Sequence, residues 1–591
     1  MYRAPVEEID HTLNHIAGLR ELLDAGLVEG LSPDVVAAIL EEAARFAGDE
    51  MAPLARIGDE HGARWHDGEV TTPPGWPELY REWCEGGWNG ISAPEEWGGQ
   101  ALPMTLSLAT LEMWNSASMG FAIGPTLTIG AIEALDKHAS DRLKKTYLEK
   151  LVSGEWIATM NLTEPQAGSD LNALKTRAEP AEDGTYRIYG QKIFITFGEH
   201  DFTENIVHLV LARLPDAPPG TKGISLFVVP KFLVNEDGTL GPRNDLFCAS
   251  IERKLGIHGA PTCTMIYGDG RFGDAPGAVG WLIGEENRGL ACMFTMMNNA
   301  RLAVGIQGVA VAEAAYQKAL AYARERRQGR APGASRSGEM SPIAEHPDVQ
   351  RMLLNMNSMV KTARALAYSC AHAMDMVRFG PQEKAAFWQE RVNLLTPVVK
   401  AFSTDIGVEV ASLGIQVHGG MGYIEETGAA ALFRDARIAP IYEGTNGIQA
   451  IDLVLRKLPQ SEGEHIRSFI AELRQSADFV RRSNMPELGE TAARLNDALA
   501  DLEEATEHLL YLLNEGETGA ALCGATPYLR LFALTAGAAM VARGAVTANS
   551  RPHGRLCRFL AESHLGETGA LKRTVVNGAE SLIAAASVME G

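Results

Sequence analysis

Residues 160–170 read MNLTEPQAGSD and lie where the periodicity of the sequence changes from helical to strand-like. Within them, Pro165 disfavours a helical conformation at Glu164. Gly168 and Ser169 offer an unobstructed backbone N–H and a hydroxyl, which together suit a phosphate oxygen. The stretch therefore predicts the start of a β domain and a candidate ligand loop. Taken alone, the same residues would also fit a polar turn before a strand.

Downstream of this stretch the sequence predicts a small β domain. Residues 186–196, 205–214 and 223–229 are short runs rich in β-branched and aromatic residues. The turn residues PDAPPG at 215–220 separate the second run from the third. Because short strands joined by turns without intervening helices are typical of antiparallel sheets, we expect an antiparallel β domain over residues 159–284.

The segment GQKIFIT, residues 190–196, carries an aromatic side chain and a hydroxyl at alternate positions. In a strand, Phe194 and Thr196 would therefore share one face of the sheet. An aromatic side chain beside hydrogen-bonding groups suits a planar heteroaromatic ring. The segment is thus a second candidate for ligand contact.

Both flanks of the predicted β domain have helical periodicity. Ser32 followed by Pro33 predicts a helix start, with a hydroxyl cap and a proline in the first turn. Residues 293–327 contain no proline and predict one long helix. We therefore expect an α+β fold with an N-terminal helical domain (1–158), a middle β domain (159–284), a C-terminal helical bundle (285–458) and an additional helical domain (459–591).

A second unusual stretch, RDARIAPIYEGTNGIQ, covers residues 434–449. Glu443 stands there between Tyr442 and Gly444. The glycine lets a ligand approach the backbone closely, which a Cβ would prevent. A carboxylate beside Ile441 and Tyr442 would be partly desolvated, which raises its pKa and suits it to proton abstraction. A surface glutamate in a loop is the alternative interpretation.

Size and charge limit the function classes. With 591 residues the chain is too long for one hydrophobic core, so several domains are expected. The net charge of −22, without a Lys/Arg-rich block, argues against nucleic acid or an anionic membrane as a partner. The seven cysteines form no C-x-x-C pair, which fits a reducing cytoplasm. The first 19 residues do not resemble a signal peptide, and no uninterrupted apolar run is long enough to span a bilayer.

Three motifs occur in a fixed order, namely TEPQAGSD at residues 163–170, GQKIFIT at 190–196 and IYEGT at 441–445. Together with the helical, β, helical order, they resemble the acyl-CoA dehydrogenase family over residues 40–455. The added C-terminal helical region is similar to that of a subgroup that oxidises 3-methylmercaptopropionyl-CoA. The resemblance implies that residues 285–458 form a four-helix bundle and that FAD is the cofactor.

The resemblance also implies a reaction. Glu443 matches the base that removes the α-proton of the acyl-CoA, while FAD takes the β-hydride at N5, giving a trans-2-enoyl-CoA. The thioester carbonyl would be held by the backbone N–H of Glu443 and a ribityl hydroxyl of FAD, which stabilises enolate-like charge. Arg301 matches an arginine near the base. The implied substrate is 3-methylmercaptopropionyl-CoA or a short- or medium-chain acyl-CoA.

Further residues match FAD contacts of the family. The positions that match flavin-lining residues are Met160, Leu162 and Thr163. Those that match pyrophosphate contacts are Gly168 and Ser169, and those beside the isoalloxazine ring are Phe194 and Thr196. The positions that match contacts to the FAD of a neighbouring subunit are Arg326, Gln416 and Gly420. Thr445 matches an adenosine-side contact.

The resemblance implies partners as well. Electron-transfer flavoprotein would accept the electrons, and a homodimer is expected because a second subunit completes the FAD sites of the family. Two alternatives stay open. An acyl-CoA oxidase shares the fold and the base but passes its electrons to oxygen. A non-enzymatic relative that binds nucleic acid is disfavoured by the net charge of −22 and by the presence of Glu443.

Overall fold

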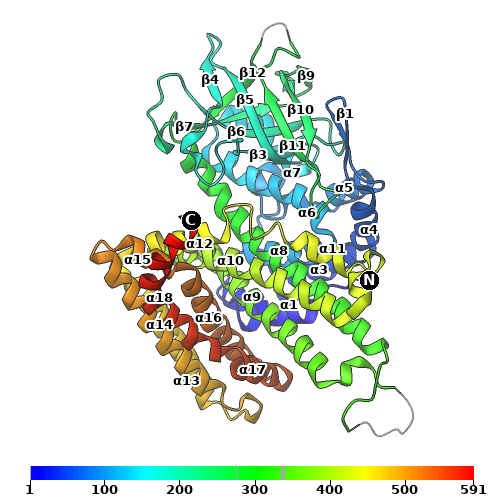
Figure 1. The fold of residues 1–591 in the computed structure, drawn as a ribbon. Coiled ribbons are helices and arrows are strands. Elements are labelled where there is room, and N and C mark those ends of the chain that lie inside the picture. Colours follow the sequence, from blue (N-terminus) through cyan, green and yellow to red (C-terminus); the bar gives the residue numbers. More distant parts are fainter. Residues whose placement is uncertain (1, 274–275, 334–339, 591) are drawn as a thin grey trace. The chain divides into compact units, whose positions relative to one another are not determined.

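The computed structural model describes residues 2–273, 276–333 and 340–590, which form two compact units (Figure 1). Unit 1 comprises Met1–Arg45, Pro103–Ser116 and Arg301–Gly591, and unit 2 comprises Phe46–Leu102 and Ala117–Ala300. Within the described residues, every strand lies in unit 2 and unit 1 is helical. The predicted α+β fold, with a β region between helical regions and further helices at the C-terminal end, is confirmed.

Unit 2 is built around an eight-stranded sheet of order β10-β11-β5-β12-β7-β6-β3, with β4 paired to β5 and β6 (Figure 1). Its strands are β3 (Ile157–Asn161), β4 (Arg177–Pro180), β5 (Tyr186–Thr196), β6 (Ile206–Arg213), β7 (Ile224–Pro230), β10 (Leu246–Ile251), β11 (Thr262–Tyr267) and β12 (Ala278–Ile283). The helices of this unit include α4 (Ala52–His61), α5 (Trp76–Glu85) and α7 (Asp141–Ser153). The three runs predicted as strands coincide with β5, β6 and β7.

The prediction of a purely antiparallel sheet is wrong at one edge. Strand β6 runs parallel to β3, and it also forms a parallel pair with β4 through Arg177 and Arg213. A parallel pair needs a long connection between its strands. Strands β4 and β5 supply that connection here, because the chain passes through both of them between β3 and β6.

Two short hairpins were not anticipated. They are β1 (Arg64–His66) with β2 (Glu69–Thr71), and β8 (Phe232–Val234) with β9 (Leu240–Arg243). The first falls in the region expected to be helical. Its turn residues Asp67 and Gly68 have φ values of 47° and 93°, which an Asp-Gly pair adopts readily in a two-residue hairpin. Strands of three residues are too short to show a periodicity.

The sheet is buried on both faces at its centre. Val207, Leu209 and Leu211 of β6 pack in one apolar cluster with α7 residues such as Leu148. The intervening Val210 and Ala212 lie in a second cluster with residues of β5 and β11. Because successive side chains of a strand point to opposite faces, this strand is apolar on both faces except at His208 and at the terminal Arg213.

Unit 1 consists of helices packed on one another. The helices that pass between the units are α6 (Met104–His138) and α8 (Gly289–Glu325), the second of which confirms the long helix predicted over residues 293–327. The others are α1 (Val6–His15), α2 (Leu19–Asp24), α3 (Pro33–Arg45), α9 (Pro347–Phe379), α10 (Ala385–His418), α11 (Ala429–Ala436) and α12 (Asn446–Asp452). The start predicted at Ser32 and Pro33 is that of α3.

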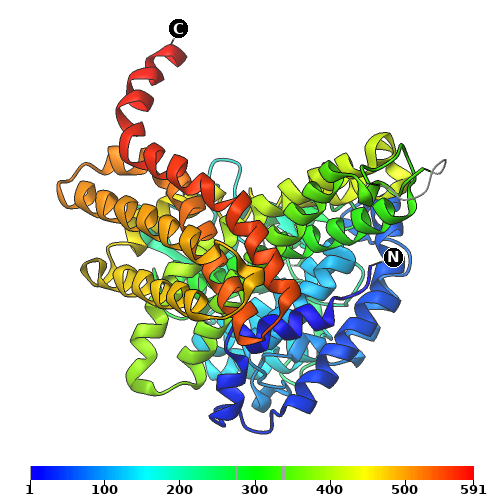
Figure 2. The ribbon, with the colours of Figure 1, turned by 90° about the horizontal axis from the view of Figure 1, so that it is seen from below.

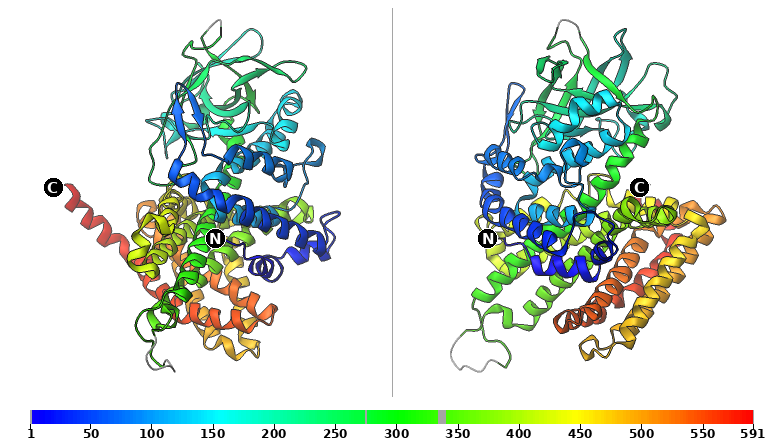
Figure 3. Two further views of the ribbon diagram at one scale, coloured as in Figure 1. Left: turned by 90° about the vertical axis from the view of Figure 1, so that its right-hand side faces the viewer. Right: turned by 180° about the vertical axis from the view of Figure 1, so that it is seen from behind.

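The additional C-terminal helices form a bundle within unit 1 (Figure 3). They are α13 (Glu464–Arg482), α14 (Thr491–Asn514), α15 (Thr518–Cys523), α16 (Ala525–Thr547), α17 (Arg551–Ser563) and α18 (Thr568–Ala586). Helix α16 contacts α13, α14, α17 and α18, and it also packs on α9, α10 and α12. Figure 2 shows the C-terminal part of α18 projecting from this bundle, and residues 580–589 are exposed.

Two helices, α6 and α16, are long and apolar enough to cross a membrane by length and composition alone. The sequence-based prediction concerned uninterrupted apolar runs, and both helices are interrupted by charged residues, such as Glu112 in α6 and Arg530 in α16. In α6 and α16 respectively, 83% and 78% of the most apolar window is buried inside the protein. These helices are therefore apolar because they belong to the core.

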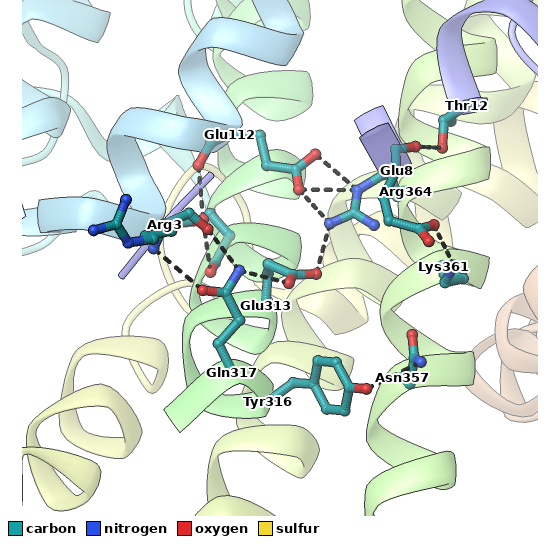
Figure 4. A network of polar contacts seen from close by, with 12 residues as sticks. Arg3, Glu8, Thr12, Glu112, Glu313, Tyr316, Gln317, Asn357, Lys361 and Arg364 are labelled. Carbon is teal, nitrogen blue, oxygen red and sulfur yellow. Dashed lines mark hydrogen bonds and ion pairs between the residues drawn. The ribbon is translucent and has the colours of Figure 1, made fainter. Parts of the chain in front are cut away.

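A buried charge network lies in unit 1, where α8, α9 and the N-terminal part of α6 meet (Figure 4). Arg364 donates to both oxygens of Glu112, with a shortest distance of 2.6 Å, and to Glu313 at 2.8 Å. The hydroxyl of Tyr368 donates to Glu112 at 2.7 Å. Although burial alone would lower it, the two carboxylates raise the pKa of Arg364 well above its ordinary value. The guanidinium therefore stays charged in the core.

Removing the charge at Arg364 is expected to destabilise the protein strongly. The change Arg364→Met would leave Glu112 and Glu313 without their cation, and breaking such a buried pair costs about 3–5 kcal/mol. Thermal unfolding followed by circular dichroism would measure the loss. Arg20→Met is the matched control, because its ion pair with Asp24 at 3.6 Å is exposed. Equal melting temperatures for the two variants would contradict the stabilising role of the network.

Candidate active site

Glu443 lies in the loop between α11 and α12, residues 437–445, which we name the Glu443 loop. Its backbone is left-handed at two successive residues, with φ of 56° at Glu443 and 85° at Gly444. The first value costs a residue with a side chain about 1–3 kcal/mol. Directly after the turn, the hydroxyl of Thr445 accepts from Ile448 N at 3.3 Å and caps α12. The C-terminal end of the loop is therefore fixed by the capped first turn of α12.

Side chains from three helices hold the Glu443 loop. Gln449 Nε2 donates to the carbonyl oxygens of Glu443 and Gly444 at 3.2 and 3.3 Å. Lys400 Nζ donates to the Gly444 oxygen at 2.7 Å. The hydroxyl of Tyr442 donates to Gln307. These bonds run to α12, α10 and α8, so the strained turn is fixed on several sides.

Two cations accompany Glu443. Its side chain is partly buried, and burial raises the pKa of its carboxyl group although Arg301 and Lys400 act in the opposite direction. Arg301 is buried and pairs with Asp452 at 3.3 Å. The site thus contains a carboxylate that is a stronger base than an exposed glutamate, together with positive charge that keeps it ionised.

In unit 2, the loop after β3 is attached to β5. Ile193 N donates to the carbonyl oxygen of Thr163 at 2.9 Å, and Lys192 Nζ donates to that of Leu162 at 2.9 Å. In β3 itself, Thr159 directly precedes Met160, and its hydroxyl donates to Thr196 O at 2.6 Å. The end of β3 and the loop that carry Met160, Leu162 and Thr163 therefore lie beside the end of β5 that carries Phe194 and Thr196.

A buried ion pair shapes the same loop. Glu164 accepts from Lys192 Nζ at 2.9 Å and from the backbone N–H groups of Lys175 and Thr176 at 2.7 and 3.0 Å. Burial alone would raise the pKa of Glu164, but Lys192 and these donors lower it to about 2. Glu164 is therefore ionised at neutral pH. Gly168 and Ser169 follow in the exposed part of the loop.

Phe194 stands at an irregularity of the sheet. The pairing of β5 with β11 shifts register between Lys192 and Ile195, and Phe194 has a φ of 60°. Phe194 is 59% exposed, whereas the neighbouring Ile195 is buried. Phe194 and the partly exposed Thr196 therefore lie on the opposite side from Ile195. An exposed aromatic residue on the strand that carries Thr196 fits the flavin ring that the sequence motifs imply.

The remaining predicted cofactor residues belong to unit 1. Gln416 lies in the last turn of α10, and Gly420 lies just beyond it. Both are exposed, and a Cβ placed on Gly420 would meet no atom within 4 Å. Arg326 is exposed immediately after α8. The structure thus gathers Arg301, Glu443 and Thr445 at one site. Gln416, Gly420 and Arg326 lie on exposed positions elsewhere in the unit.

Several residues that hold the site were missed from the sequence. They are Lys400, Asn446 and Gln449 around the Glu443 loop, and Glu164 with Lys192 in unit 2. One signal was present, because Lys400 interrupts the apolar run LLTPVVKAF at residues 394–402. A lysine in the apolar stripe of a helix must find polar partners in the fold.

Four family profiles match consecutive parts of the chain. They describe the N-terminal domain (residues 34–155), the middle domain (159–269) and the C-terminal domain (287–458) of acyl-CoA dehydrogenase, and an acetyl-CoA dehydrogenase C-terminal-like domain (464–586). Together these matches cover most of both units. The last one falls on the helices α13 to α18.

Individual relatives are similar over most of the chain. 3-Methylmercaptopropionyl-CoA dehydrogenase of Ruegeria pomeroyi is 47% identical over 90% of this chain and 88% of its own length. A butyryl-CoA dehydrogenase of Syntrophomonas wolfei is 37% identical over 76% of this chain and 74% of its own. The crystal structure of an acyl-CoA dehydrogenase complexed with FAD from Bacillus anthracis has a TM-score of 0.73 at 22% identity, covering 93% and 89% of the two chains.

The ion pair of Glu164 and Lys192 is expected to control the order of its loop. Glu164→Ala would remove the acceptor of two backbone N–H groups and leave Lys192 buried without its partner, at a cost of about 3–5 kcal/mol. Amide hydrogen exchange over residues 163–176 should become faster. Glu179→Ala is the control, because its ion pair with Arg177 at 2.8 Å is exposed. Unchanged exchange in the Glu164 variant would contradict this role.

Proposed function

Because the chain belongs to the acyl-CoA dehydrogenase family and is therefore an FAD-dependent oxidoreductase of acyl-CoA thioesters, we propose that Glu443 is its catalytic base. One observation carries this proposal. The Glu443 carboxyl group is partly buried, with a raised pKa, beside the cations of Arg301 and Lys400. A carboxylate in this state accepts a proton more readily than an exposed one.

The reaction breaks two C–H bonds and forms one C=C bond. Glu443 takes the α-proton, a hydride leaves the β-carbon, and the acyl thioester becomes a trans-2-enoyl-CoA. When bound, FAD supplies the oxidant that accepts this hydride. The α-carbon of a thioester is a weak acid, so the charge that develops on its carbonyl oxygen must be stabilised.

The backbone N–H of Glu443 is the donor that we assign to the thioester oxygen. For this N–H, the structure records no acceptor among the residues that it describes. A donor without a partner is available to a substrate and needs no rearrangement during the reaction. The same residue would then orient the substrate with its backbone and deprotonate it with its side chain.

We assign the residues that would hold FAD from the motifs that they match. For the flavin and its ring we assign Met160, Leu162, Thr163, Phe194 and Thr196, and for the pyrophosphate Gly168 and Ser169. Thr445 would contact the adenosine side. Arg326, Gln416 and Gly420 would reach the FAD of a second subunit, which is supported by their exposure in the single chain. A homodimer is therefore the proposed assembly.

The proposed substrate is 3-methylmercaptopropionyl-CoA or a short-chain acyl-CoA. The relative from Ruegeria pomeroyi, which carries the first activity in its name, supports this choice through its 47% identity. The butyryl-CoA dehydrogenase of Syntrophomonas wolfei supports the short-chain alternative. We further propose electron-transfer flavoprotein as the acceptor and the cytoplasm as the location, where the seven unpaired cysteines would stay reduced.

Glu443→Gln is expected to retain FAD but to lose turnover by several orders of magnitude, because an amide does not accept the α-proton. Flavin content from the visible spectrum and turnover with an artificial electron acceptor would be measured together. Glu426→Gln is the matched control on an exposed glutamate of the same unit. Turnover close to that of the unchanged protein would remove Glu443 from the role of base.

The substrate proposal is tested by anaerobic titration, following the loss of flavin absorbance at about 450 nm. The thioesters would be butyryl-, octanoyl-, palmitoyl- and 3-methylmercaptopropionyl-CoA. We expect bleaching by 3-methylmercaptopropionyl-CoA or butyryl-CoA and not by palmitoyl-CoA. Preference for palmitoyl-CoA would contradict the substrate class. Rapid reoxidation in air with peroxide formation would favour an oxidase over a dehydrogenase.

A further inference from the structure

Lys400 is a fully buried lysine in the middle of α10, with an exposed fraction of 0%. Its ammonium group donates to the Gly444 carbonyl oxygen at 2.7 Å and to Asn446 Oδ1 at 2.9 Å. Both acceptors belong to neutral groups. Among the residues that the structure describes, no carboxylate lies within ion-pair distance of Lys400. The lysine therefore carries a charge that its direct partners do not neutralise.

Asn446 connects the same loop to α10 a second time. Its amide nitrogen donates to Asp405 Oδ1 at 2.7 Å and to the Ala401 oxygen at 3.1 Å. Its backbone N–H donates to the Pro440 oxygen at 3.0 Å and so closes the Glu443 loop on itself. Lys400 and Asn446 together fix the segment that follows Glu443 directly to the helix.

The charge of Lys400 acts on Glu443. Burial lowers the pKa of Lys400 to about 7, and the carboxylates of Glu443 and Asp405 act against this shift. In return, Lys400 and Arg301 lower the pKa of Glu443 against the effect of burial. The charged groups around this pair come from α8, α10 and α16, and from α12 and the residues after it. They are Arg301, Asp405, Glu409, Asp452, Arg456, Lys457 and Arg530.

A purely structural role does not require an ammonium group at position 400. A neutral amide or hydroxyl would serve as donor to a carbonyl oxygen, and burying an unneutralised cation is costly. Asp405 already accepts a hydrogen bond from the Asn446 amide. Glu443 is the other carboxylate whose charge interacts with that of Lys400. The charge therefore has an electrostatic effect on the site besides its hydrogen bonds.

We propose that Lys400 is a positioning residue for Glu443, which holds the Glu443 loop through Gly444 and Asn446 and, together with Arg301, keeps the catalytic carboxylate ionised. This inference rests on the proposed role of Glu443 as the base. The Lys400 side chain has two separable effects. The hydrogen bonds set the geometry of the loop, and the charge sets the pH range in which Glu443 accepts a proton.

The test compares Lys400→Met with the unchanged protein in the flavin reduction step. The rate of flavin bleaching in a single anaerobic turnover would be measured as a function of pH with the best thioester. Ionised Glu443 is needed, so the rate falls as the pH drops through the pKa of Glu443. Loss of the nearby positive charge destabilises the carboxylate and raises this pKa. The acidic limb should therefore move to higher pH by about one unit, with about a tenfold lower rate below both midpoints.

Lys361→Met is the matched control, because Lys361 is a partly buried lysine on a helix of unit 1 and pairs with Glu8 away from the Glu443 loop. It should leave the acidic limb unchanged. An acidic limb in Lys400→Met that coincides with that of the unchanged protein would overturn the electrostatic part of the proposal. An equal shift in Lys361→Met would also overturn it, since the effect would then be general destabilisation.

Asn446→Ala tests whether the hydrogen bonds of Lys400 and Asn446 set the geometry of the Glu443 loop. It also provides a test if Lys400→Met does not fold. It keeps the charge of Lys400 but removes one of its two acceptors and the contact to Asp405. We expect a plateau rate at high pH lowered at least fivefold with an unshifted acidic limb. An unchanged plateau would overturn the role of this contact.

The failure of this inference can be told from the failure of the proposed function. If no thioester bleaches the unchanged protein, or if Glu443→Gln turns over normally, the proposed function is wrong. If the unchanged protein is bleached and Glu443→Gln is inactive, the position of the acidic limb in Lys400→Met decides the role of Lys400 alone.

Discussion

The backbone at Glu443 and Gly444 is held in the left-handed region, and the active site depends on contacts that keep it there. This conformation costs a residue with a side chain about 1–3 kcal/mol. Gln449 and Lys400 bind the two carbonyl oxygens of the turn, and Tyr442 is bound to Gln307. Both carbonyl oxygens of the turn therefore have donors, whereas the N–H of Glu443 has no acceptor in the described chain. The strained turn thus leaves free the donor that we propose for the thioester oxygen.

The additional C-terminal helices contribute to the same support. Helix α16 packs on α10, which carries Lys400, and on α12, which starts directly after the Glu443 loop. Its approach to α9 is close, because a Cβ on Gly537 would lie 2.4 Å from the side chain of Thr362. Arg530 of α16 also pairs with Glu409 of α10 at 2.7 Å. These helices therefore support α10 and α12, which hold the Glu443 loop.

The sequence predicted the elements whose signal is local, and it missed those that depend on distant residues. The strands β5, β6 and β7 follow from short apolar runs between turns, and α8 from a long segment without proline. The parallel pairing of β3 with β6 depends on how the chain passes through β4 and β5, which no local pattern encodes. Lys400 is visible as a lysine in an apolar run, but only the fold brings it to a carbonyl 44 residues away.

The buried cations Arg364, Lys192 and Lys400 have different kinds of partners, and the difference indicates their roles. Arg364 has two carboxylates in the core, and Lys192 has Glu164. Lys400 instead binds a carbonyl and an amide oxygen, so its attraction for a carboxylate is not consumed by a direct partner. A salt bridge at this position would have fixed the loop equally well while weakening the field at Glu443. Neutral acceptors hold the lysine in place and leave its charge to act on Glu443, the proposed base, whose pKa stays raised because burial still exceeds the effect of both cations.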